Sequence, residues 1–271
     1  MRAATIPLLL FTFLFSGAAL IAQDTDTVKV DLSKLEKPNK LRFTIAPYAW
    51  LAGMSTDVGG EKIRQSFNDL SSVTNLGLQA AVIVRYNRWS LQTNFTYANL
   101  AADQEIGPIT AELDIVQIIW ENKLGYLLID RIDDADDIIR GWSMETTAGL
   151  IYWSNDIEVA LEYPIDLPIL PARLDEFQNW TDLVIGANFR IYLSKRVLLA
   201  LSGNVGGFGI GNSSKLYYDL FYANTFRISK LLAVTAGYKS FTYDREDGSG
   251  DDQVSTKVKT YGPLIGLSFH F

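Results

Sequence analysis

The chain ends in Tyr261-Gly-Pro-Leu-Ile-Gly-Leu-Ser-Phe-His-Phe271, where large apolar side chains alternate with small or polar ones. A period of two is typical of a β-strand, because successive side chains point to opposite faces. One face of this segment is apolar and the other is small and polar. The stretch therefore predicts a terminal strand that lies between an apolar environment and a polar one.

The same alternation recurs along the chain, for example over residues 89–97 and 183–191. Counting such segments gives ten strands, and past residue 23 no window is long and apolar enough for a membrane-spanning helix. The predicted strands cover residues 41–52, 76–86, 89–100, 110–126, 142–153, 180–193, 197–207, 215–228, 231–243 and 256–271.

The connections between these strands alternate in length. Tight turns are expected at 87–88, 194–196 and 229–230, and longer loops at 53–75, 101–109, 154–179, 208–214 and 244–255. Residues 127–141 break the rule, being long where a short turn is expected. Short turns on one rim and long loops on the other are typical of a transmembrane barrel. The sequence thus predicts an all-β fold, a single antiparallel transmembrane β-barrel of about ten strands over 41–271, with eight or twelve as alternatives.

Aromatic residues gather near the predicted strand ends. In a bilayer, such amphipathic rings form girdles at both interfaces. The short-turn end carries Tyr86, Trp89, Tyr126 and Trp142, and the long-loop end carries Tyr97, Tyr152, Tyr218, Tyr238 and Tyr261. The terminal strand also has a suitable length, since roughly 33 Å of strand tilted by about 45° spans roughly 23 Å.

The N-terminus has the order of a secretory signal peptide. Arg2 is followed by an apolar run over residues 6–15 and then by small residues that end at Ala22. We expect a cleaved signal over 1–22, with Ala19 as the alternative cleavage site, and a polar lead-in over 23–40.

The terminal segment resembles the insertion signal of bacterial outer-membrane β-barrel proteins, which the barrel-assembly machinery reads. Tyr261, Phe269 and Phe271 carry this resemblance. Residues 47–53, 205–211 and 262–271 also resemble a group of small, poorly characterised, porin-like outer-membrane barrels. The resemblance implies a location in the bacterial outer membrane, but hardly any activity.

Composition excludes several classes of protein. The 271 residues include no Cys and one His, which excludes a disulfide scaffold, a thiolate metal site, a cysteine nucleophile and a lipoprotein. Lys and Arg number 24 against 31 Asp and Glu, for a formal net charge of −7. Nucleic acid is not an expected partner, because neutralising phosphates requires a basic face.

The polar face of the strands carries charges near the short-turn end. Opposite charges in a narrow lumen are expected to pair, because an unpaired buried charge is costly. We expect a network across the lumen formed by Arg42, Arg85, Glu121, Glu145, Arg190 and Arg227. The alternative is a selectivity ring, in which the same charges line a narrow aqueous pore.

No catalytic site and no cofactor are predicted. His270, the only His, shares an inward face with Ser268, and no third residue orients it. The acidic clusters at 130–137 and 244–252 are expected to be solvated loops. Asp244, Asp247 and Asp251 are the candidates if calcium binds.

The sequence thus predicts a non-enzymatic outer-membrane barrel, either structural or a narrow or gated passage for small solutes, with a lumen partly closed by charges. Its expected partners are outer-membrane lipid, the barrel-assembly machinery during biogenesis, and small solutes. The alternative is a secreted soluble β-barrel that binds a small apolar ligand, as lipocalins do. A membrane barrel is apolar outside and polar inside, whereas a soluble barrel has the reverse pattern.

Deletion of Phe271 is expected to reduce the amount of folded, membrane-inserted protein without affecting export. Cell fractionation combined with heat-dependent gel migration measures both quantities. Normal insertion of the shortened chain would contradict the assignment of Phe271 to the insertion signal.

Overall fold

The computed structural model describes residues 40–58, 61–106, 109–133, 140–162, 173–247 and 254–271. The predicted signal peptide and nearly all of the lead-in lie outside these residues. The elements are β1 (Arg42–Trp50), β2 (Gly53–Val58), β3 (Glu61–Gln65), α2 (Phe67–Val73), β4 (Thr74–Tyr86), β5 (Trp89–Ile106), β6 (Ile109–Asp133), β7 (Arg140–Glu162), β8 (Arg173–Tyr192), β9 (Val197–Gly207), β10 (Leu216–Arg227), β11 (Leu232–Asp247) and β12 (Val254–His270).

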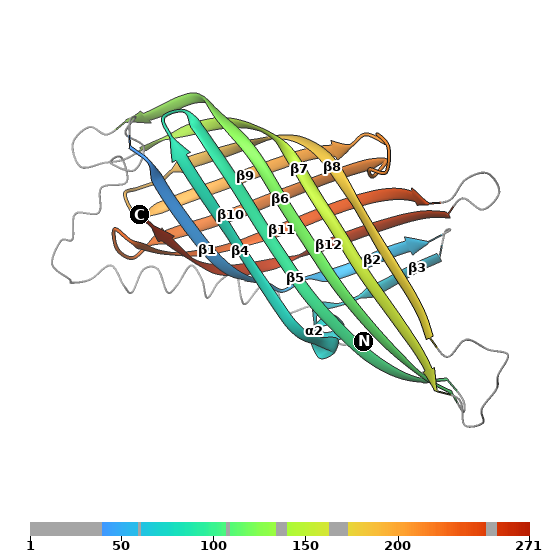
Figure 1. Ribbon diagram of the computed structural model, residues 1–271. Helices are drawn as coiled ribbons and strands as arrows, with labels where there is room; N and C mark the ends of the chain where they lie inside the picture. The colour runs from blue at the N-terminus through green and yellow to red at the C-terminus, as the bar shows by residue number, and fades with distance from the viewer. Residues whose placement is uncertain (1–39, 59–60, 107–108, 134–139, 163–172, 248–253) are drawn as a thin grey trace, which may run out of the picture. The chain divides into compact units, whose positions relative to one another are not determined.

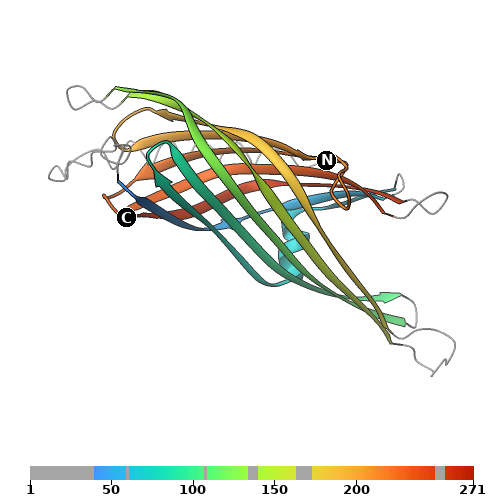
Figure 2. The same cartoon turned by 45° about the horizontal axis from the view of Figure 1, so that its top comes forward.

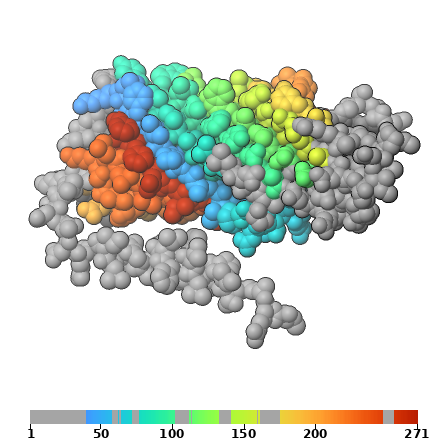
Figure 3. Space-filling model, turned by 60° about the horizontal axis from the view of Figure 1, so that its bottom comes forward, coloured from blue at the N-terminus to red at the C-terminus, as the bar shows by residue number. Residues whose placement is uncertain are grey.

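Ten of these strands close into an antiparallel barrel (Figure 1). β1 pairs with β4 on one side and with β12 on the other, and β4 to β12 pair in sequence order. At the closing seam Thr44 lies opposite His270 and Tyr48 opposite Gly266. Figure 3 shows the C-terminal strand, in red, directly against the first strand, in blue. The predicted all-β barrel of ten strands is confirmed.

The region 53–75 is not the simple loop that the sequence predicts. After a break at Leu51 and Ala52, β2 continues along β12, and β3 folds back on β2. The sheet therefore contains twelve strands. Ten of them form the closed ring, and β2 and β3 extend the sheet beside β12.

Helix α2 joins β3 to β4 and packs against β2, β3 and β5. It begins with a capping box. The backbone N–H and the hydroxyl of Ser66 each donate to Asp69 Oδ2 at 2.7 Å, and Asp69 N–H donates to Ser66 Oγ at 3.3 Å. These donors hold the pKa of Asp69 below its usual range.

Residues 127–141 are also mostly strand, not a long connection. β6 and β7 remain paired up to Asp133 opposite Arg140, past a register shift between Leu127 and Ile129. Such a bulge adds a residue to one strand and shifts the inward and outward positions by one. The shift interrupts the period of two, and for that reason sequence alternation missed this part of the hairpin.

The wall made by β5 to β8 is taller than the opposite wall. β6 and β7 contain 25 and 23 residues, whereas β9 and β10 contain 11 and 12. Figures 1 and 2 show the long strands running far past the tops of β9 and β10. In the extension Asp103 pairs with Glu112. The end of β5 is polar over residues 103–105, so no apolar face marks it, whereas β6 keeps the alternation of apolar and polar residues over 109–115.

The outer surface of the barrel is apolar, as the terminal strand predicts. Ile265 and Leu267 are 54% and 44% exposed, whereas Gly266 and Ser268 between and beside them are buried and face inward. Ile185 and Phe189 on β8 also point outward. This pattern is opposite to the one that a lipocalin-like soluble barrel requires. The helices of the described ranges include none that is long and apolar enough to cross a membrane.

The predicted girdle residues all lie on outward positions of their strands. Tyr86, Trp89 and Trp142 are exposed at the short-turn end, and Trp89 contacts Tyr126 edge to face with ring centroids 4.8 Å apart. The exposed rings toward the loop end are Tyr152, Tyr218, Tyr238 and Tyr261.

A lysine in the middle of the apolar surface is expected to destabilise the barrel in lipid. Ile185→Lys should cost about 2–4 kcal/mol, because it buries a charge in hydrocarbon, and the cost should fall to about 0–1 kcal/mol near an interface. Leu193→Lys is the matched control, since Leu193 lies on the same face of the chain at the short-turn end of β8. Urea unfolding in lipid vesicles measures both variants. Equal losses of unfolding free energy at the two positions would contradict the placement of Ile185 in the middle of the lipid-facing surface.

Candidate functional site

All six residues of the predicted charge network lie on the inner face of the barrel. Five of them line a common cavity near the short-turn end, whereas Glu145 is buried in the wall and is absent from the cavity lining. The residues are Arg42 on β1, Arg85 on β4, Glu121 on β6, Glu145 on β7, Arg190 on β8 and Arg227 on β10.

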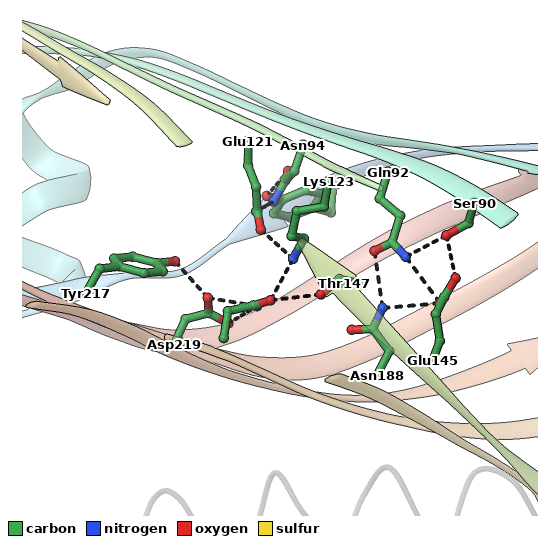
Figure 4. Close-up of polar contacts among 12 residues, drawn as sticks. Ser90, Gln92, Asn94, Glu121, Lys123, Glu145, Thr147, Asn188, Tyr217 and Asp219 are labelled. Carbon is green, nitrogen blue, oxygen red and sulfur yellow. Dashed lines mark hydrogen bonds and ion pairs between the residues drawn. The ribbon is translucent and has the colours of Figure 1, made fainter. Parts of the chain in front are cut away.

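Glu145 is the centre of one cluster and is 1% exposed. Its carboxylate lies 3.4 Å from Arg85 Nη1 and 4.0 Å from Arg190 Nη2. Ser90 donates a short hydrogen bond to it, and Gln92 and Asn188 donate at 3.2 and 3.3 Å. The cluster joins β4, β5, β7 and β8, as the right half of Figure 4 shows for the hydrogen-bonding residues.

Gly125 makes room for this carboxylate. It lies on β6, between the strands that carry Ser90 and Glu145, and a Cβ on Gly125 would lie 2.5 Å from Glu145 Oε1. The backbone of β6 therefore carries no side chain at the point where the Glu145 side chain crosses it toward β5. The sequence contains this glycine, but its role depends on which side chains flank it in the sheet.

Glu121 does not join the arginines, contrary to the single network that the sequence predicts. Its partner is Lys123, two residues along the same strand and on the same face, with Nζ and Oε1 2.5 Å apart. Neither Arg42 nor Arg227 forms an ion pair with Glu121 or Glu145. The period of two explains the difference, because it places Lys123 closer to Glu121 than any residue across the lumen.

A second polar cluster continues from Lys123 across the lumen. Lys123 Nζ donates to Asn204 Oδ1 at 3.3 Å, and Asn204 Nδ2 donates to Asp219 at 2.9 Å. Tyr217 OH also donates to Asp219, at 2.8 Å. Since β7 and β8 separate β6 from β9, the contact between Lys123 and Asn204 joins strands that are three places apart in the ring.

The half of the lumen toward the long loops is filled by aromatic rings, which sequence reasoning missed. Trp153 stacks on Trp180 with centroids 5.5 Å apart, and it contacts Tyr217, Phe241 and Tyr243 at 5.9, 5.4 and 5.2 Å. Trp153 is 1% exposed and Trp180 3%. The sequence did contain a signal that Trp153 points inward. Trp153 follows Glu145 by an even number of residues, so the two side chains share the inward face of β7.

Asp182 anchors this aromatic cluster to the loop between β9 and β10. Its carboxylate accepts hydrogen bonds from Trp153 Nε1 at 2.9 Å and Trp180 Nε1 at 3.3 Å, and from the backbone N–H and hydroxyl of Ser214 at 2.6 and 2.8 Å. The glycine-rich stretch 205–211 makes this loop, and Gly207 and Gly209 have φ values of 84° and 64° that favour glycine. The loop is thereby held over the end of the lumen.

The proposed insertion-signal residues Tyr261, Phe269 and Phe271 all point outward and are at least partly exposed. Phe271 also contributes to the closing seam, because its N–H donates to Phe43 O at 2.8 Å and its carbonyl accepts from Phe43 N–H at 3.1 Å. The terminal residue is therefore paired with the first strand through its backbone.

The remaining predicted residues carry no assembled site. His270 Nδ1 lies 3.1 Å from Thr44 Oγ1 at the short-turn end. Of the calcium candidates, Asp251 and the side chain of Asp247 lie outside the described residues, and Asp244 accepts from Ser255 Oγ at 3.4 Å. The described side chains include no group of three potential metal ligands.

A cavity of about 370 Å³ occupies the lumen below the aromatic cluster. Its lining extends from Arg42 and His270 at the short-turn end to Tyr48, Asp219 and Lys239 at mid-height. The lumen thus has a hollow half and a filled half.

No protein-family model and no curated protein sequence matches the chain. Solved structures to which it is similar include the outer membrane protease OmpT from Escherichia coli, with 8% identity and a TM-score of 0.49 over 86% of this chain and 97% of that one. Neisserial surface protein A has 10% identity and a TM-score of 0.34, over 86% and 100%. OprG from Pseudomonas aeruginosa has 13% identity and a TM-score of 0.33, over 86% and 97%. All three are bacterial outer-membrane β-barrel proteins.

Gly125→Ala is expected to destabilise the folded barrel by about 1–3 kcal/mol, because the added methyl overlaps the Glu145 carboxylate and forces it to move. Gly203→Ala is the matched control on the outward face of β9, where the nearest atom is a Leu220 methyl at 3.3 Å. Urea unfolding in detergent measures both. A neutral effect at Gly125 would show that the position of Glu145 is not constrained by β6.

Proposed function

We propose that this protein is an integral barrel of the bacterial outer membrane with no catalytic role, whose lumen is closed at rest. The apolar outer face, the aromatic girdles and the ring of ten strands support the location. The charge clusters and the aromatic cluster support the closed lumen. In this proposal the short-turn end faces the periplasm, because β1, the first described strand, begins at that end.

The main support for a closed lumen is that polar contacts cross it. Lys123 reaches Asn204 between walls that are three strands apart, and Glu145 holds residues from three other strands. Ten strands are near the size at which side chains alone fill a barrel, since eight leave room only for side chains. The rings around Trp153, which pack together in the half of the lumen toward the long loops, support the same proposal.

A non-catalytic role is supported by the surroundings of the only histidine. His270 contacts Thr44, and the described contacts of its ring include no carboxylate that would orient it as a general base. It also lies at the end opposite the long loops, away from the outer leaflet in the proposed orientation.

A gated passage for small solutes is the second candidate, and the cavity below the aromatic cluster favours it. Opening would require the rings around Trp153 to move and the bridge between Lys123 and Asn204 to break. In this second candidate function, a closed lumen is the resting state of the passage.

The intact protein is expected to show little or no steady conductance in planar lipid bilayers. Glu145→Ala should produce brief openings, because loss of the carboxylate removes the bridge between β7 and the arginines and leaves like charges facing each other. Glu112→Gln on the exposed extension of β6 is the control and should stay silent.

A large, steady conductance from the unmodified protein would overturn the closed lumen. The same charged residues would then be a selectivity filter, which is the alternative that the sequence left open.

A further inference from the structure

Arg227 is buried without a counter-charge in the part of the chain that the structure describes. It is 6% exposed and lies on the inner face of β10, at the last residue of the strand. No described carboxylate oxygen lies within 4.0 Å of its guanidinium, and no described group accepts a hydrogen bond from it. Arg85 and Arg190 differ, since both lie against Glu145. A buried unpaired charge is unfavourable, so the surroundings of Arg227 are set for an anion.

The neighbours of Arg227 leave space and offer hydroxyl groups. Arg227 lies opposite Ala233 on β11, and Ala233 lies opposite Ser268 on β12, so a methyl group is the only side chain between them. Thr235 Oγ1 lies 3.0 Å from Thr225 Oγ1 and 3.4 Å from Ser268 Oγ. These hydroxyls line the same cavity as Arg227. They provide neutral donors and acceptors beside a fixed positive charge.

Apolar side chains form another part of the lining, beside the charged residues at mid-height such as Asp219 and Lys239. Leu198, Phe221 and Leu264 contribute to the cavity wall, together with Ala200 and Ala223. A volume of about 370 Å³ falls in the range of about 300–1,000 Å³ that is typical of small-molecule sites. The cavity therefore suits a molecule that has one anionic group and a compact apolar body.

We propose that this cavity binds a small organic carboxylate from the short-turn end of the barrel, with Arg227 as the anion-binding residue. The planar guanidinium of an arginine matches a carboxylate with two parallel hydrogen bonds. The hydroxyls of Thr225, Thr235 and Ser268 surround the anionic group, and the apolar wall takes the rest of the molecule. Access is from the short-turn end, because Arg42 and His270 at that end line the cavity and the rings around Trp153 occupy the lumen at the other end.

Titration of the purified, folded barrel in detergent with benzoate tests the proposal, and benzamide is the neutral ligand of the same shape. Benzoate is expected to bind saturably and at least tenfold more tightly than benzamide. Arg227→Gln should weaken benzoate binding at least tenfold, whereas Arg227→Lys should retain part of it. Arg196→Gln is the matched control, because Arg196 lies exposed in the neighbouring turn and outside the cavity lining, and it should change binding by less than twofold.

Thermal unfolding gives a second readout that a purely structural arginine would not produce. Without ligand, Arg227→Gln should unfold at the same temperature as the native protein or higher, because it removes an unpaired charge. Benzoate should then raise the unfolding temperature of the native protein and not that of the variant. Heat-dependent gel migration verifies that each variant is folded.

Any one of three binding results would overturn the proposal: no saturable benzoate binding by the folded native barrel, equal binding of benzoate and benzamide, or undiminished binding by Arg227→Gln. A variant that unfolds far below the native temperature would do the same, since it would make Arg227 a structural residue. The closed lumen is tested separately by conductance, so silent bilayers without benzoate binding would leave the proposed function standing.

Discussion

Closure of the sheet between β1 and β12 is the constraint on which the rest of the structure depends. A strand edge carries unpaired N–H and C=O groups, and in hydrocarbon no water satisfies them, so only a closed ring of strands is stable there. The seam meets this requirement along the whole of β1 and, through β2, along the upper part of β12 as well. The terminal residue takes part, since Phe271 exchanges two backbone hydrogen bonds with Phe43.

Once the ring is closed, each strand has one face in the apolar surroundings and one in a narrow interior. The interior favours pairing of the charges it contains, because an unpaired buried charge is costly. In the polar half, two clusters hold several of these charges, one centred on Glu145 and one that runs from Glu121 to Tyr217, whereas Arg227 has no counter-charge among the described residues. Small residues are part of the arrangement, as Gly125 shows by leaving β6 bare where Glu145 crosses it.

The two halves of the lumen have different physical characters. Toward the long loops, the stacked rings of Trp153 and Trp180 exclude water, and Asp182 satisfies both indole N–H groups while it holds Ser214. Toward the short turns, the interior is hollow and lined by arginines and hydroxyls. Among the described residues, aromatic side chains therefore occupy one half of the lumen and a cavity of about 370 Å³ occupies the other.

Sequence by itself determined the fold and the direction of its faces. The alternation in residues 261–271 and in the other strands fixes which side chains point outward. Shifting such a strand by one residue would turn its whole apolar face toward the interior, so only one orientation is stable. For the same reason, the inward positions of Arg85, Glu145 and Arg190 followed from the sequence. The limits of the strands did not, since the end of β5 carries the consecutive polar residues Asp103, Gln104 and Glu105, and the bulge near Leu127 shifts the period.

Only the tertiary structure decided which interior residues meet. Glu121 pairs with Lys123 and not with an arginine, and Trp153 meets Tyr243 from a strand four places away in the ring. Such contacts depend on the stagger and tilt of the closed sheet, which set the height of each side chain along the lumen. The isolation of Arg227 is of the same kind. Its inward position is a property of the sequence, but the lack of a neighbouring carboxylate among the described residues is a property of the closed barrel.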